Sequence, residues 1–255
     1  MLQRVAQEAG EIILGHFEEG MAFHHDIKAD GTPVSIADRD AEIHIQKALA
    51  GLGIPVVGEE TAADGIEYNL SGGRYFLIDP LDGTREFIKG GSEWTINIAF
   101  IDNNIPEIGI VYAPALNQLF YAYGPETATR VNTQTGKEKQ IHTRRPLKSG
   151  ITIAASKNRD REQVEAFAQN YHVQKTVRIG SALKICAIAA GDADIYPCFG
   201  PTCEWDTAAG QAVLHAAGGV LESMNGAPLM YGKTKDGFKN PSFVARTADV
   251  PLILP

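Results

Sequence analysis

Residues 75–87 read YFLIDPLDGTREF, an apolar run long enough for a buried strand that ends in two acids, Asp79 and Asp82. Asp, Pro and Gly are turn residues, but a turn needs only one such carboxylate, and each of these charges raises the electrostatic cost of the other. A shared divalent cation removes the conflict, because Mg²⁺ prefers carboxylate and carbonyl oxygens. We therefore predict a metal site in which Asp79, Asp82 and the main-chain carbonyl of Leu81 present oxygens around one bend.

The residues around the two acids favour an anion beside the metal. Pro80 fixes the bend, and Gly83 permits close approach of the backbone to a ligand. If a helix begins at this point, the amides around Gly83 and Thr84 face that ligand. The stretch is then a cradle for both a metal ion and a phosphate.

The composition indicates a globular chain without a targeting or membrane segment. Of 255 residues 44% are hydrophobic, enough for one large domain or two smaller ones packed together. The first residues of the chain, MLQRVAQEAGEIILGHFEEG, are too interrupted by charge for a signal peptide, and no run of about 18 apolar residues occurs. We expect a cytoplasmic protein with no transmembrane segment.

Charge and cysteine content exclude further classes. The formal net charge of -8 argues against a nucleic-acid polymer as partner, because affinity for a phosphate backbone comes from clustered Lys and Arg. Cys186, Cys198 and Cys203 lack the CxxC spacing of zinc or redox sites, so we expect reduced structural thiols. The sequence does not indicate an oligomeric state.

The spacing of apolar residues changes near the middle of the chain. Apolar residues recur at helical spacing over residues 3–19 and 35–52, and β-type runs follow from residue 55 to residue 123, which predicts a largely antiparallel meander. After a polar, turn-rich stretch, strands alternate with helices that begin near Arg161, Ser181 and Asp206. We expect an α+β domain over residues 1–146 with a mostly antiparallel sheet, and an α/β domain over residues 147–255 with a mixed sheet.

Three other stretches place acids at the ends of elements, and each has a plainer interpretation. VVGEET ends a strand in Glu59 and Glu60, which as a pair are more often solvated than functional, although Glu59 is a reasonable bridging ligand in a two-metal site. EWDTAAGQAVLHAAGG begins with an acid, Asp206, that an ordinary helix N-cap explains. KADGTPVSIADRDAE predicts a turn over residues 28–31 and places Asp38 in the first turn of a helix, where the helix dipole alone favours it.

Taken together, GEE, DPLDGT and WDTAAG in this order resemble the signatures of the inositol monophosphatase superfamily, Mg²⁺-dependent and lithium-sensitive phosphatases. The resemblance covers nearly the whole chain and implies a layered α-β-α-β fold of the sugar-phosphatase type. Within the superfamily, DPLDGTREFIKGGSEWTINIAFID, GIVYAP, GSALKIC and YPCFGPT look most like the CysQ-type 3'(2'),5'-bisphosphate nucleotidases. Those enzymes hydrolyse adenosine 3',5'-bisphosphate, a by-product of sulfate activation in sulfur metabolism, to AMP and phosphate.

The resemblance also implies residue roles. The positions that match the ligands of two or three Mg²⁺ ions are Glu59, Asp79, the Leu81 carbonyl, Asp82 and Asp206. Asp38 and Thr84 match the pair that orients and deprotonates the attacking water, and Glu60 lies beside the ligands. The positions that match substrate contacts are Glu59, Leu81, Asp82, Gly83, Thr84, Ser181, Lys184 and Asp206, of which Ser181 and Lys184 match those that hold the second phosphate of a nucleotide. Membership would leave peripheral association with the cytoplasmic face of the inner membrane open.

Two positions depart from the nucleotidases. Cys198 stands where they usually have an arginine that contacts phosphate, and Arg159 falls where many have histidine. Losing one charged hydrogen bond to phosphate costs about 1.5–3 kcal/mol unless Arg159, Arg178 or Lys184 compensates. An inositol or sugar monophosphatase, with fructose 1,6-bisphosphate among its substrates, is therefore the alternative. A regulatory cation-binding module is disfavoured, because its ligands would lie within one EF-hand-like loop.

Overall fold

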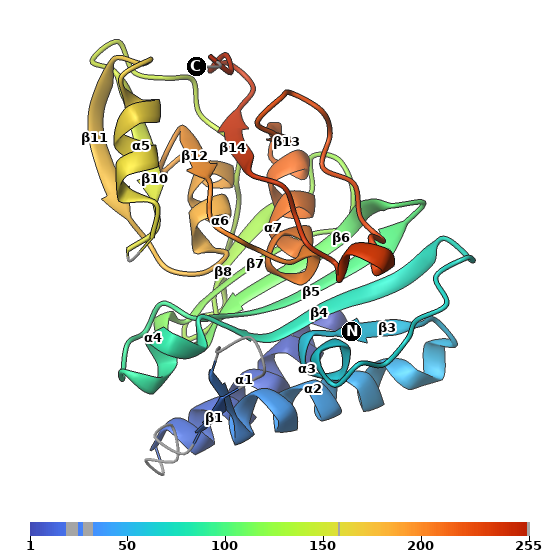
Figure 1. Ribbon diagram of the computed structural model, residues 1–255. Coiled ribbons are helices and arrows are strands. Elements are labelled where there is room, and N and C mark those ends of the chain that lie inside the picture. Colours follow the sequence, from blue (N-terminus) through green and yellow to red (C-terminus); the bar gives the residue numbers. More distant parts are fainter. Residues whose placement is uncertain (19–24, 28–32, 158, 254–255) are drawn as a thin grey trace.

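The structure is a computed structural model that describes residues 1–18, 25–27, 33–157 and 159–253 (Figure 1). The predicted turn over residues 28–31 lies outside the described residues. The chain begins with helix α1 (Leu2–Glu18), the short strands β1 (His25–Ile27) and β2 (Pro33–Ser35), and helix α2 (Ile36–Leu49) with a 3-10 turn after it. These helices confirm the first two predicted by apolar spacing.

A seven-stranded sheet follows, in the order β3-β4-β5-β6-β7-β8-β9. Only the edge pair β3 and β4 is parallel, and the neighbouring strands from β4 onward run antiparallel, so the predicted meander is confirmed. The bounds of its elements are β3 (Val56–Gly58), α3 (Glu59–Ala63), β4 (Arg74–Asp82), α4 (Thr84–Ile88), β5 (Thr95–Asp102), β6 (Ile105–Ala113), β7 (Gln118–Ala122), β8 (Thr129–Asn132) and β9 (Lys137–Gln140).

The second sheet has five strands in the order β11-β10-β12-β14-β13. Strand β10 pairs in parallel with β11 and β12, whereas β14 pairs antiparallel with β12 and β13, so the expected mixed sheet is confirmed. The bounds of its elements are β10 (Ile151–Ala155), α5 (Arg161–Ala168), β11 (Val173–Arg178), α6 (Leu183–Ala189), β12 (Ile195–Cys198), α7 (Glu204–Ala216), β13 (Gly219–Ser223) and β14 (Phe243–Thr247).

The elements stack in layers, as Figure 1 shows, with α1 and α2 on one face of the large sheet and α6 and α7 between the two sheets. Helix α5 packs on the far face of the small sheet, an outer layer beyond the predicted α-β-α-β order. Helix α7 comes close to β6 because its face is rich in alanine and because Gly109 of β6 has no side chain: a Cβ there would collide with the carbonyl of Ala209.

The chain passes from the large sheet to the small one between Gln140 and Ile151. The largest apolar cluster nevertheless contains side chains from both sheets, from Val57 to Ala245, so the two halves share one core across α6 and α7. The division into domains at residue 146 stays a prediction. None of the three cysteines forms a disulfide, and no described helix has both the length and the apolar character needed to cross a bilayer.

Strands β8 and β9 were missed by the sequence analysis, which predicted only polar, turn-rich chain there. All of β9 is exposed, and β8 buries only Val131 completely, so neither strand shows the alternation of apolar and polar residues that identifies a half-buried strand. Backbone pairing joins β8 to β7 and β9 to β8, which extends the sheet without adding much to the core.

Candidate metal and phosphate site

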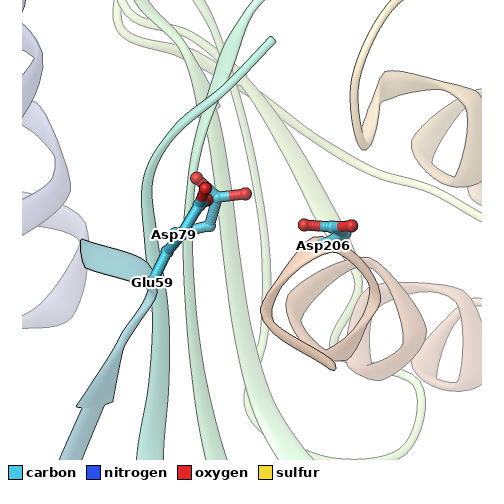
Figure 2. Close-up of side chains that lie close together, drawn as sticks. All are labelled: Glu59, Asp79 and Asp206. Atoms are coloured by element: carbon cyan, nitrogen blue, oxygen red, sulfur yellow. The ribbon is translucent and has the colours of Figure 1, made fainter. Parts of the chain in front are cut away.

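Three predicted metal ligands meet at the ends of their elements. Strand β3 is parallel to β4 with Gly58 opposite Ile78, so the next residues, Glu59 and Asp79, leave the sheet side by side. Asp206 approaches them from the first turn of α7 (Figure 2). Each of the three offers one carboxylate oxygen, and these oxygens lie within 4.8 Å of one another. We call Glu59, Asp79 and Asp206 the carboxylate triad.

Asp79 is the most deeply buried member of the triad, with 1% of its surface exposed. Its Oδ1 accepts a hydrogen bond from the Leu81 amide at 3.0 Å, whereas its Oδ2 has no hydrogen-bond partner among the described residues. Burial, followed by the charges of Glu59, Asp82 and Asp206, raises the pKa of Asp79 well above its usual range. A buried oxygen without a donor is costly unless a ligand binds it.

The pKa values of Asp206 and Asp82 are raised as well. Burial and the charges of Asp82 and Glu59 raise the pKa of Asp206 to about 8, although its Oδ2 accepts the Cys203 amide at 2.8 Å. Burial also raises the pKa of Asp82, and the cation of Lys184 opposes that effect. Acids that resist ionising together, one of them with an unpartnered oxygen, are a donor set that fits a hard divalent cation.

Leu81 and Asp82 lie at the end of β4, where the pairing with β5 is irregular between Asp79 and Asp82. Asp82 is not a member of the triad, but its charge acts on both Asp79 and Asp206. The Leu81 carbonyl lies 3.1 Å from the Thr84 hydroxyl, whose single proton serves either this oxygen or Asp38.

Asp38 and Thr84 are in contact, although one belongs to α2 and the other begins α4. The Thr84 hydroxyl donates to Asp38 Oδ1 at 3.1 Å, and Asp38 is only 2% exposed. Because a hydroxyl has one proton and two lone pairs, donation to Asp38 leaves Thr84 able to accept a proton from a water molecule. The expected helix start at Thr84 is confirmed, since the Gly83 carbonyl accepts the amides of Glu86 and Phe87.

Gly83 must be glycine for two reasons. Its φ of 98° lies in the left-handed region, and a Cβ would lie 2.5 Å from the Ser181 hydroxyl. That hydroxyl is 2.8 Å from the carbonyl of Asp82 and 2.9 Å from the carbonyl of Glu93, and its single proton serves one of them at a time. Ser181 therefore connects the segment before α6 to the chain bend over residues 79–84, which we call the acidic bend.

Lys184 is a buried cation next to the acids. Its Nζ donates to the Ser181 carbonyl at 2.7 Å and lies 5.3 Å from the centre of the Tyr196 ring, and 7% of the residue is exposed. Burial lowers the pKa of Lys184, and the charge of Asp82 raises it. The amine therefore supplies positive charge on the side of Asp82.

The two departures from the nucleotidase pattern differ in exposure. Cys198 ends β12 and is 3% exposed, with its thiol 3.9 Å from the Gly200 carbonyl. Arg159 is exposed, and its guanidinium donates to the Pro201 carbonyl at 3.2 Å. The charge of Arg159 lowers the pKa of both Asp82 and Asp206, so this cation acts on the site.

Sequence reasoning missed Glu42, which supports the strand end that carries Glu59. Its buried carboxylate accepts the Glu60 amide at 2.8 Å and the Thr61 amide at 2.9 Å, and it fills the space that a Cβ at Gly58 would need. Glu60 is itself 2% exposed beside the triad. The available signal was position, because Glu42 follows Asp38 by one helical turn and shares its face of α2.

Comparisons with known proteins agree with this geometry. The profile of the inositol monophosphatase family matches residues 1–247. The 3'(2'),5'-bisphosphate nucleotidase CysQ of Escherichia coli K12 is 38% identical over 242 residues, 94% of this chain and 96% of the relative, and that of Salmonella typhimurium LT2 is 38% identical over 248 residues, 95% and 98% of the two chains.

Solved structures extend the likeness to the fold. The crystal structure of CysQ from Bacteroides thetaiotaomicron, a bacterial member of the inositol monophosphatase family, is 32% identical with a TM-score of 0.78 and covers 97% of this chain and 95% of its own. The family resemblance predicted from the acidic motifs is therefore confirmed, and this protein belongs to the inositol monophosphatase family.

Proposed function

We propose that this protein is a Mg²⁺-dependent phosphatase that hydrolyses adenosine 3',5'-bisphosphate to AMP and phosphate. The observation that carries the proposal is the carboxylate triad: one oxygen of each acid lies within 4.8 Å of the others, and Asp79 Oδ2 has no hydrogen-bond partner among the described residues. The substrate follows from the curated relatives, which are named 3'(2'),5'-bisphosphate nucleotidases and match nearly the whole chain.

The acids would hold two or three Mg²⁺ ions through Glu59, Asp79, Asp82, Asp206 and the Leu81 carbonyl. Bound there, Mg²⁺ supplies positive charge against the phosphate and makes water more acidic. The protein's own part is to position these charges, since phosphoryl transfer needs little covalent chemistry from side chains. Lithium sensitivity and a cytoplasmic location stay predictions.

Water is the proposed nucleophile, and the Thr84–Asp38 pair is its proton acceptor. The water oxygen bonds to phosphorus as the bond from phosphorus to the ribose 3'-oxygen breaks, and that oxygen leaves with AMP and takes up a proton from solvent water. The proton released by the water passes to the Thr84 hydroxyl, which donates in turn to Asp38 Oδ1 at 3.1 Å. Burial of Asp38 keeps that carboxylate in one orientation.

In this proposal the substrate lies against the acidic bend over residues 79–84. The cleaved phosphate would lie against Asp82, Gly83 and Thr84, beside the acids of the triad that would hold Mg²⁺. The second phosphate of the nucleotide lies toward Ser181 and Lys184, where the buried amine offers a positive charge. The Ser181 hydroxyl already donates to the Asp82 carbonyl. We therefore assign Ser181 two roles: it fixes the acidic bend at Asp82, and it contacts the substrate.

The test is phosphate release from adenosine 3',5'-bisphosphate and from inositol 1-phosphate, each with Mg²⁺ and with EDTA. We expect a higher kcat/KM for the nucleotide and no turnover in EDTA. A higher kcat/KM for inositol 1-phosphate would replace the substrate but keep the phosphatase. Mg²⁺ binding without turnover of either ester would overturn the enzyme itself.

A further inference from the structure

Strand β5 carries polar atoms that the protein leaves without partners. Asn97 is 1% exposed, and neither its Oδ1 nor its Nδ2 has a hydrogen-bond partner among the described residues. Thr95 is fully buried, and its Oγ1 also has no hydrogen-bond partner among the described residues. Burying an unpaired amide or hydroxyl is costly, so such groups in a well-packed strand call for a ligand.

The strand register places these atoms beside the acids. Asn97 lies opposite Asp79 and Thr95 lies opposite Asp82 in the antiparallel pairing of β4 with β5. Residues that face each other across such a pair have side chains on the same face of the sheet, with Cβ atoms about 4.5–5.5 Å apart. Asn97 is therefore a direct cross-strand neighbour of Asp79, the residue whose Oδ2 has no partner among the described residues.

Burial of the alternate residues identifies the face. Ile96 and Ile98 pack in the cluster that includes α1 and α2, whereas Ala99 and Ile101 pack in the cluster that includes α7. Because side chains alternate along a strand, the side chains of Asn97 and Thr95 lie on the α7 face, from which Asp206 also approaches.

The chemistry of the unpartnered atoms specifies the ligand. A bare cation would satisfy the acceptors Asp79 Oδ2 and Asn97 Oδ1, but Asn97 Nδ2 is a donor and needs an acceptor. Water bound to a divalent cation presents both protons and lone pairs, and Mg²⁺ usually keeps several of its waters. A hydrated divalent cation therefore satisfies the whole set.

We propose that Asn97 and Thr95 are positioning residues that hydrogen-bond the hydration shell of the divalent cation at the carboxylate triad. This inference rests on the proposed function, because it needs a cation at the triad. Neither side chain touches the substrate: each orients the water that surrounds the metal, much as outer hydrogen-bond partners orient metal ligands elsewhere.

Two substitutions test the role by metal binding rather than by activity. Asn97→Leu and Thr95→Val remove the polar atoms with little change in volume. We expect Mg²⁺ binding, measured by titration calorimetry, to weaken about 10-fold or more, the usual loss when an outer partner of a metal site is removed. Thr95→Ser keeps the hydroxyl, and we expect it to restore the wild-type affinity.

Melting in EDTA separates this role from a structural one. Removing an unpaired buried polar group should leave the metal-free Tm unchanged or raise it. The matched control is Thr152→Val in β10, because Thr152 is equally buried but its hydroxyl accepts a hydrogen bond from Arg144 at 3.0 Å. We expect that change to lower the metal-free Tm and to leave Mg²⁺ binding alone.

Unchanged Mg²⁺ affinity in both Asn97→Leu and Thr95→Val would overturn the inference. A fall in metal-free Tm like that of the Thr152 control would do so too, because it would mean that the protein itself satisfies these atoms. The proposed function fails differently: wild-type protein would then bind no Mg²⁺ or hydrolyse no phosphate ester, whatever Asn97 does.

Discussion

The carboxylate triad and the segment over residues 181–198 are built in opposite ways. The triad sits on the ends of β3, β4 and α7, so the large sheet and its covering helix fix the positions of the acids. In the other segment, Ser181 and Lys184 bond to backbone carbonyls, and Cys198 is buried at the end of β12. One region holds charges in conflict, and the other holds its two polar side chains on backbone carbonyls.

This difference teaches where chemistry and specificity are encoded. Carboxylates that repel one another at the end of a rigid strand are stabilised when a cation binds, which suits them to reactions that a metal promotes. In the other region the cation of Lys184 is held by the Ser181 carbonyl and presents positive charge near Asp82. Substitutions in the two regions should therefore differ in kind as well as in size.

The largest effect is expected from Asp79→Asn. It removes a charge from the centre of the triad, and we expect kcat/KM to fall at least about 10³-fold, the upper end of the loss when one oxyanion-hole donor is deleted. Metal-free protein should become more stable in EDTA, because Asp79 is held among Glu59, Asp82 and Asp206. Phosphate release and melting curves measure the two effects. A lower metal-free Tm would mean that the acids support the fold rather than burden it.

A smaller loss is expected from Thr84→Val. The change keeps the shape of the side chain but interrupts the hydrogen bond to Asp38 Oδ1. We expect kcat to fall on the order of 10²-fold, the low end for general acid-base catalysis, with little change in KM. Thr84→Ser retains the hydroxyl and serves as the matched control. If the Ser and Val variants lost the same activity, the methyl group rather than the proton path would be important.

The fold was largely predictable because its signals are local. Apolar spacing indicated α1 and α2, and alternating or continuous apolar runs indicated the strands from β3 to β7. The pairing of β3 with β4 could not be predicted, because it joins residues that no local pattern connects. Exposed β9 carried no pattern at all, since its hydrogen bonds rather than its side chains hold it in the sheet.

The site was predictable where its residues form a recognisable pattern within one short stretch of sequence. Asp79 and Asp82 conflict within one turn, and that conflict is visible without a structure. Glu42 and Asn97 each look ordinary, one acid on a helix and one amide in a strand. Their meaning depends on burial and on a neighbour from another element, the amide of Glu60 for one and the side chain of Asp79 for the other.

Arg159 lies outside the segment over residues 181–198, but its charge acts on Lys184 and Cys198 in that segment. Arg159→Met tests whether this exposed arginine takes the place of the phosphate-binding arginine where this chain has Cys198. We expect KM for adenosine 3',5'-bisphosphate to rise about 10-fold, the low end for a charged hydrogen bond, and KM for adenosine 3'-monophosphate to stay unchanged. Arg178→Met is the matched control, because that guanidinium is also exposed but donates to the Ser156 carbonyl. An equal rise in KM for both substrates would assign Arg159 to the general field of the site.

The smallest effect is a pH dependence of metal-free stability. The pKa of Asp206 is raised to about 8 in the folded protein, against about 3.9 for an unfolded chain. Between these values the folded state holds a proton that the unfolded state has lost, so this contribution to the free energy of unfolding is full below about pH 4 and is lost as pH rises toward 8. The raised pKa of Asp79 has the same sign.

Mg²⁺ binds the ionised carboxylates, so its stabilising effect should grow over the same range. We expect the difference in Tm between Mg²⁺ and EDTA to widen by a few degrees from pH 6 to pH 8.5, because about 1 kcal/mol shifts Tm by about 2–4 °C in a domain of this class. Asp206→Asn should reduce that slope, whereas Arg178→Met, which removes a guanidinium bonded to the Ser156 carbonyl, should not. A difference that stayed constant with pH would mean that the acids bind the cation without releasing protons, and the conflict inferred among them would be absent.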